Sequence, residues 1–107
     1  MKKLKPNIIT SNNKEIRVHE LKVWHEFYDS LVTEDLSKRK TFEVRKNDRD
    51  YQVGDFLLLK DYYPKVKAYS DKFTWKRITY ILNDIRFLPK DIIVLGIIDE
   101  IPNINIE

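Results

Sequence analysis

The chain has no cysteine. Disulfides, thiolate nucleophiles and cysteine-ligated zinc or iron–sulfur sites are therefore excluded. Long apolar runs are also missing, since no segment approaches the roughly 18 apolar residues that a membrane helix needs. The basic start at residues 1–6 is not followed by the apolar stretch of a secretory signal. We expect a cytoplasmic protein that does not associate with membranes.

Length and hydrophobic content limit the number of domains. The chain has 107 residues, of which 42% are hydrophobic. This is enough for one ordered domain with a single core and too little for two. We predict a domain over residues 16–101. An N-terminal tail or loosely added strand is expected at 1–15 and a C-terminal tail at 102–107.

Strand-like segments dominate the sequence. They span residues 16–24, 41–46, 56–59, 73–82 and 92–98, and the last is expected to be buried on both faces. The polar segment 47–55 predicts a loop and a tight turn, and residues 62–71 predict an exposed loop.

One segment has helical spacing. Its apolar residues are Phe27, Tyr28, Leu31, Val32 and Leu36. They predict an amphipathic helix from His25 to about Leu36. Together with the strands, this gives a mainly β (α+β) fold: about five to six mostly antiparallel strands that close toward a small barrel, with one main helix.

Positive charge is concentrated in one short window. The whole chain carries a net charge of +3, yet residues 38–49 contain six cationic and two acidic side chains, a net of +4, which leaves −1 for the remainder. The positive potential therefore has one source, which suits a polyanionic partner. The alternative interpretation is that these charged side chains only face solvent at the protein surface.

The strand at 41–46 carries the strongest candidate site. Alternation places Thr41, Glu43 and Arg45 on one face and predicts that Phe42 and Val44 anchor the strand in the core. A guanidinium close to a carboxylate can hold it ionised and oriented. Lys40, also nearby, would leave a positive pocket suited to a phosphate or a base edge. A surface ladder of cross-strand charge pairs is the alternative.

These residues resemble the signature Gly-x-Lys-x-x-Glu-x-Arg of the ASCH-related branch of the PUA-like superfamily. Lys40, Glu43 and Arg45 match it, and Lys38 stands where glycine is usual. The chain more closely resembles a small domain-of-unknown-function family found in phage and bacterial genomes. The shared motifs are His-Glu-Leu-Lys at 19–22 with Trp24, Lys-Thr-Phe-Glu-Val-Arg-Lys-Asn-Asp-Arg at 40–49, Tyr-Gln-Val-Gly-Asp at 51–55, Ile-Thr-Tyr-Ile-Leu at 78–82 and Val-Leu-Gly-Ile at 94–97.

The resemblance implies a compact PUA-like β-barrel whose cleft binds RNA or a nucleotide. It assigns Lys40, Glu43 and Arg45 to that cleft, and Glu20 and Lys22 through the first-strand motif. With their basic and aromatic neighbours, the candidate nucleic-acid or nucleotide-binding residues are Glu20, Lys22, Trp24, Lys38, Lys40, Thr41, Glu43, Arg45, Lys46, Asn47 and Arg49. Trp24, Tyr51 or Trp75 could supply a stacking face. Glu20 and Lys22 are expected to pair at the edge of the cleft.

Two other functions remain open. Some small ASCH proteins resemble amidohydrolases that act on an acylated cytidine, and Lys40 stands at the matching lysine. The threonine nucleophile of those enzymes is replaced by Glu43, so that activity would need Thr41 in its place. A phage or host protein-interaction factor that docks through the tyrosine-rich segment 62–69 is the other alternative.

Metal binding is not expected. His19 and His25 are six residues apart and lack a third partner with a known ligand spacing. His19 is predicted to be a partly buried histidine with satisfied hydrogen bonds. We expect a monomer without a metal or an organic cofactor.

Overall fold

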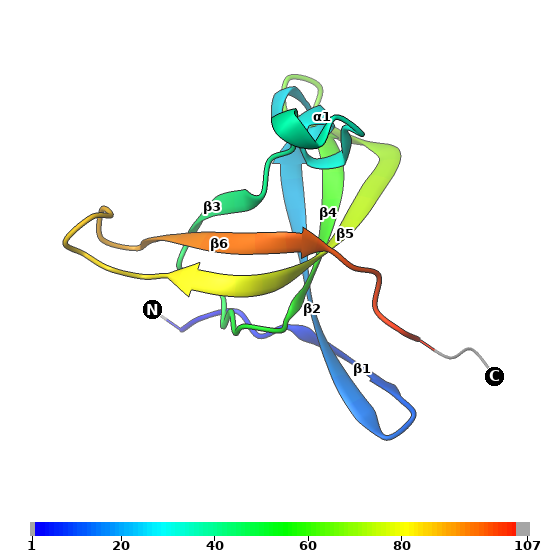
Figure 1. Cartoon of the computed structure of the whole chain (residues 1–107), viewed down its shortest axis with the longest axis vertical. Helices are drawn as coiled ribbons and strands as arrows, with labels where there is room; N and C mark the ends of the chain where they lie inside the picture. The colour runs from blue at the N-terminus through cyan, green and yellow to red at the C-terminus, as the bar shows by residue number, and fades with distance from the viewer. Residues whose placement is uncertain (1, 105–107) are drawn as a thin grey trace.

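The computed structural model describes residues 2–104, which form six strands in one curled sheet and one α-helix (Figure 1). The strands are β1 (Asn7–Ser11), β2 (Lys14–Trp24), β3 (Phe42–Lys46), β4 (Phe56–Tyr63), β5 (Ala68–Leu82) and β6 (Ile92–Asp99). Their order in the sheet is β1-β2-β4-β5-β6-β3. The mainly β class with one main helix is therefore confirmed.

The sheet is mixed, because β2 and β4 run parallel while every other neighbouring pair is antiparallel. A parallel pair needs a long connection between its strands. Here that connection is residues 25–55, which include the helix and β3. The chain thus leaves the sheet after β2, lays β3 on the far edge, and returns to β4.

The helix α1 (His25–Val32) lies at the end of the sheet where β2 finishes (Figure 1). Tyr28 and Leu31 are buried against the sheet, as the apolar spacing predicted. The helix ends earlier than predicted, because the backbone leaves helical geometry at Thr33. Leu36 begins a separate 3-10 turn, Leu36–Lys38, and is exposed.

The core packs against one face of the sheet and the helix. Its fully buried side chains include those of Leu57, Leu59, Ile78 and Leu95, which alternate with outward-facing residues along β4, β5 and β6. The strand at 92–98 forms as predicted, although Ile98 is exposed, so burial on both faces is not complete.

The sheet curls but does not close into a barrel. β3 pairs only with β6, and within the described residues nothing pairs with the outer edge of β2 over Glu20–Trp24. The side chain of Arg45, on β3, spans the opening and donates a hydrogen bond from Nη2 to the carbonyl oxygen of Lys22, on β2, at 2.9 Å. The predicted closure was therefore wrong: a side chain bridges the two edges where a backbone ladder was expected.

The N-terminal segment forms the added strand that was one of its two predicted states, whereas the segment 62–71 differs from its prediction. Residues 7–11 form β1, which pairs with β2 through a tight turn at Asn12 and Asn13, both with positive φ. The loop predicted at 62–71 is instead the tip of the β4–β5 hairpin, with a turn limited to residues 64–67. Of the predicted C-terminal tail, residues 102–104 have no regular structure and 105–107 lie outside the described residues.

No helix in residues 2–104 has the length and apolar character required to cross a membrane.

Candidate functional site: a cleft where the sheet does not close

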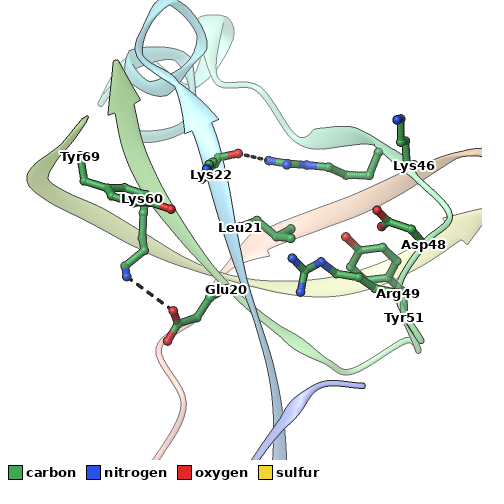
Figure 2. A pocket seen from close by; sticks show the side chains of 10 residues that line it. Glu20, Leu21, Lys22, Lys46, Asp48, Arg49, Tyr51, Lys60 and Tyr69 are labelled. Carbon is green, nitrogen blue, oxygen red and sulfur yellow. Dashed lines mark hydrogen bonds and ion pairs between the residues drawn. The ribbon is translucent and has the colours of Figure 1, made fainter. Parts of the chain in front are cut away.

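A cleft of about 380 Å³ lies between β2 and β3, at the opening of the sheet (Figure 2). We call it the basic cleft. Its lining residues are Glu20, Leu21, Lys22, Arg45, Lys46, Asp48, Arg49, Tyr51, Lys60 and Tyr69. Five cationic and two acidic side chains give it an excess of positive charge. An opening in the sheet thus coincides with the basic window of the sequence.

Arg45 fixes the width of this opening. Besides its bond to the Lys22 carbonyl, its Nη2 atom lies 3.6 Å from Oε1 of Glu43. A guanidinium has five N–H groups, so these two contacts leave donors free for a ligand. Arg45 is held in place from both sides and still carries unused hydrogen-bonding capacity.

Lys46 and Arg49 approach the cleft from β3 and the loop that follows it (Figure 2). Among the described residues, neither side chain forms an ion pair or a hydrogen bond. Lys46 and Arg49 line one wall of the cleft, and their positive charges are available to an anionic ligand.

The opposite wall combines cations with tyrosine rings. Lys22 Nζ lies 4.6 Å from the ring centroid of Tyr62, and Lys60 Nζ lies 5.2 Å from that of Tyr69. Lys60 also pairs with Glu20 at 3.5 Å. The expected Glu20–Lys22 pair is therefore not formed, because Lys60 on the neighbouring strand β4 is the closer cation. In Figure 2 the sticks of Lys60 and Tyr69 lie across β2 from those of Lys46 and Asp48.

Glu43 faces the interior and is only 3% exposed. Its Oε2 atom accepts a hydrogen bond from Lys40 Nζ at 3.0 Å. Phe42 and Val44, predicted to anchor β3 in the core, are instead exposed. The prediction of which side chains of this strand face the core was wrong. Two cations offset the cost of removing the Glu43 carboxylate from water, so that this side chain can point inward. The expected pairing of Glu43 with Arg45 is present, and Lys40, which was expected only to add positive charge, also pairs with Glu43.

Tyr51 lies at the base of the basic cleft and packs against the core. Burial raises the pKa of its phenol to about 12, although the nearby Arg45 and Arg49 act in the opposite direction. Its ring also contacts the ring of His19, with the centroids 4.7 Å apart. The phenol is therefore neutral at physiological pH and can donate a hydrogen bond.

A buried polar cluster supports the cleft from below. Nε2 of His19 lies 2.8 Å from Asp55, and Nε of Arg17 donates to the same carboxylate at 2.7 Å. Burial alone would raise the pKa of Asp55, but these hydrogen bonds outweigh it and the pKa is lowered. His19 is fully buried, more than predicted, and its Nδ1 atom has no hydrogen-bond partner among the described residues.

A second hollow of about 540 Å³ continues along the same opening toward the helix. We call it the aromatic hollow. Its lining residues are Lys22, Val23, Trp24, Phe27, Lys40, Phe42, Glu43, Val44 and Arg45. It shares Lys22 and Arg45 with the basic cleft. The two sites therefore meet at the bridge that joins β3 to β2.

Most of the candidate residues predicted from the sequence meet in these two hollows. Those that line one or both are Glu20, Lys22, Trp24, Lys40, Glu43, Arg45, Lys46 and Arg49. Lys38 and Thr41 are exposed outside both, and Asn47 lines a separate hollow with Lys90. The Thr41 hydroxyl has no hydrogen-bond partner among the described residues, so no base activates it here. Trp75, a possible stacking residue, lines a different hollow beside Lys76.

Sequence reasoning missed the residues contributed by the β4–β5 hairpin and the helix. Lys60 and Tyr69 line the cleft, and Tyr62 contacts Lys22 and Tyr69 beside it, because the hairpin extends through the segment that was predicted to be a loop. Phe27 was assigned to the buried helical face but borders the aromatic hollow. One signal in the sequence could have found them. If Leu57, Leu59 and Asp61 of one strand point inward, alternation makes Lys60 and Tyr62 point outward.

The two histidines are held by different carboxylates. His25 Nδ1 lies 3.0 Å from Asp61, which is fully buried, whereas His19 contacts Asp55. Residues 2–104 contain no group of three histidine, cysteine or acidic side chains arranged to hold a metal ion.

Comparison with known proteins places the chain in a family. No curated protein matches it. The model of one family, described as a domain of unknown function, DUF3850, matches residues 18–97. That match runs from within β2 to within β6 and contains every residue that lines the two hollows. With three quarters of its length matched, the chain belongs to the DUF3850 family of domains of unknown function.

Proposed function

We propose that this protein binds nucleic acid, with RNA as the first candidate, or a free nucleotide, and that the basic cleft holds the phosphates. The observation that carries the proposal is the group of cations at the opening of the sheet: Lys22, Arg45, Lys46, Arg49 and Lys60 line one cleft. Phosphate oxygens are the usual partners of such a group, because each cation can donate charge-assisted hydrogen bonds to them.

Aromatic rings beside the cations favour single-stranded ligands over simple anions. Tyr62 and Tyr69 are in contact with each other and with the ammonium groups of Lys22 and Lys60. Proteins that bind single strands combine a positive groove with rings on which bases stack. The resemblance of Lys40, Glu43 and Arg45 to the ASCH signature of PUA-like proteins supports the same proposal.

The test is the binding of a labelled single-stranded RNA, and of DNA with the same sequence, followed by fluorescence anisotropy at several salt concentrations. Affinity should fall as salt rises, with a slope of roughly −0.7 in log–log form for each phosphate contact. Replacement Arg49→Ala should weaken binding about fivefold, because a charge-assisted hydrogen bond contributes about 1 kcal/mol or more. The guanidinium of Arg49 has no protein partner in residues 2–104, so the fold should be unaffected.

The matched control is Lys14→Ala, which removes one exposed positive charge at the start of β2, away from the cleft. It should leave both the affinity and the salt slope unchanged. Equal losses in the two variants, or binding that does not respond to salt, would show that the basic cleft is not the site. Arg45→Ala should abolish binding, because it removes a cation and the bridge that shapes the cleft.

A further inference from the structure

Three aromatic rings stand half-exposed around the aromatic hollow. Trp24 comes from the end of β2, Phe27 from the first turn of α1 and Phe42 from the start of β3, and they are 52%, 49% and 46% exposed. A single exposed aromatic residue is ordinary. Three rings from separate elements around one hollow form an apolar surface that a flat aromatic ligand could cover.

Polar groups line the same hollow. Lys40 Nζ lies 5.6 Å from the ring centroids of both Phe27 and Phe42 and is fixed by its bond to Glu43. The backbone edge of β3 is also available. Thr41 O accepts from Ile97 N and Asn47 N donates to Asp91 O, so odd-numbered residues of this strand direct their backbone toward β6. By alternation, the backbone N–H and C=O of Val44 face the opening of the sheet, where β3 has no partner strand among residues 2–104.

The aromatic hollow and the basic cleft are continuous through Lys22 and Arg45. One site is thus rich in cations, the adjoining one is rich in aromatic surface, and Arg45 stands between them. A nucleotide has the same division, with an anionic phosphate and a flat, apolar base that carries hydrogen-bonding groups at its edge.

We propose that the aromatic hollow takes one unpaired nucleobase while the phosphate of the same nucleotide occupies the basic cleft. This inference rests on the proposed function and narrows it. The base stacks on the exposed rings, and the open edge of β3 offers hydrogen bonds to the base. A base within a duplex is paired and stacked and cannot enter the hollow, so the ligand is a mononucleotide or one unit of a single strand.

The experiment compares three probes by isothermal titration calorimetry: a nucleoside 5′-monophosphate with each of the common bases, ribose 5-phosphate, which lacks the base, and the nucleoside, which lacks the phosphate. With the native chain, at least one monophosphate should bind at least about fivefold more tightly than ribose 5-phosphate, since stacking of one base contributes about 1–3 kcal/mol. A single-stranded oligonucleotide should also bind more tightly than a duplex of the same length.

The variants separate the two halves of the site. Trp24→Ala and Phe27→Ala should each lower the affinity for the monophosphate and leave the affinity for ribose 5-phosphate unchanged. Arg49→Ala should lower the affinity for the monophosphate and the affinity for ribose 5-phosphate by the same factor. Phe87→Ala, which removes an exposed ring that lines neither hollow, is the matched control and should change nothing.

A spectroscopic measurement checks the position of the base directly. The chain has two tryptophans, so Trp75→Phe leaves Trp24 as the only one. Its fluorescence should be quenched by the monophosphate and not by ribose 5-phosphate.

The outcomes distinguish this inference from the proposed function. Equal affinity for the monophosphate and ribose 5-phosphate would overturn base binding in the aromatic hollow and leave phosphate binding in the cleft intact. So would a duplex that binds as tightly as a single strand. If none of the phosphate-containing probes or oligonucleotides binds, the proposed function itself is wrong.

Discussion

Replacement of Glu43 by glutamine should destabilise the protein strongly although it changes only one oxygen to nitrogen. The carboxylate is 3% exposed and lies between Lys40 Nζ at 3.0 Å and Arg45 Nη2 at 3.6 Å. Removal of one partner from a buried ion pair costs about 3–5 kcal/mol, because the remaining charge is left without compensation. The side chains of Lys40 and Arg45 are still about one-fifth exposed, which lets water relieve part of this penalty. We therefore expect Glu43→Gln to lower the free energy of unfolding by about 2–3 kcal/mol.

The assay is urea unfolding followed by circular dichroism, with Glu20→Gln as the matched control. Glu20 is also paired with a lysine, Lys60, but at 3.5 Å and with both side chains at least 40% exposed. An exposed pair contributes about 0–1 kcal/mol, so the control should unfold almost as the native chain does. The double variant Lys40→Met with Glu43→Gln should recover part of the loss, because the unpaired ammonium is then absent. If the two single glutamine variants were equally stable, Glu43 would not be a buried carboxylate whose charge is compensated by Lys40 and Arg45.

Three further predictions concern other polar groups. Because the pKa of Asp55 is lowered in the folded state, its stabilising contribution is present above the unfolded value near 3.9 and is lost as the pH falls through the folded pKa. The stability difference between the native chain and Asp55→Asn, measured by urea unfolding, should therefore shrink on acidification, and a constant difference would contradict this. The pKa of Tyr51 is raised to about 12. The contribution of its neutral phenol to the free energy of unfolding is therefore present below about pH 10 and is lost as the pH rises toward 12. Ultraviolet titration of tyrosinate should show a late component that Tyr51→Phe removes. Lys76 is buried, donates to the carbonyl of Leu31 at 2.5 Å and pairs with Asp99. Its replacement by methionine should lower the free energy of unfolding by about 1–3 kcal/mol, because the carbonyl and the carboxylate each lose a partner; an unchanged midpoint of thermal unfolding would refute this.

Local patterns in the sequence were sufficient to locate five of the six strands, though not their full lengths, and the start of the helix. The alternation over residues 16–24 predicted a strand, and the structure has β2 there. Three of the five cations that line the basic cleft, Arg45, Lys46 and Arg49, belong to the basic window at 38–49, because they come from one short strand and the loop that follows it. Both features depend on neighbouring residues alone, which is why one sequence sufficed.

The inward face of β3 could not be predicted in the same way. Hydrophobicity favoured Phe42 and Val44 for the core, whereas the structure buries Glu43. A buried carboxylate is stable only if cations reach it, and the position of Lys40 depends on the path of the chain after the helix. Similarly, the extension of the β4–β5 hairpin depends on cross-strand partners such as Tyr62 and Tyr69, which a local pattern does not show.

The cleft and the open sheet have the same cause. For the sheet to close, β3 would have to pair along Glu20–Trp24 of β2, and the two backbone edges would then satisfy each other. Instead, Arg45 reaches from β3 to the Lys22 carbonyl, and the space on either side of its side chain forms the two hollows. A side-chain bridge needs a wider separation than the roughly 4.8 Å between paired strands. Arg45 and Lys22, the two residues joined by this bridge, are also the two cations shared by both hollows, so the binding site we propose lies where the sheet stays open.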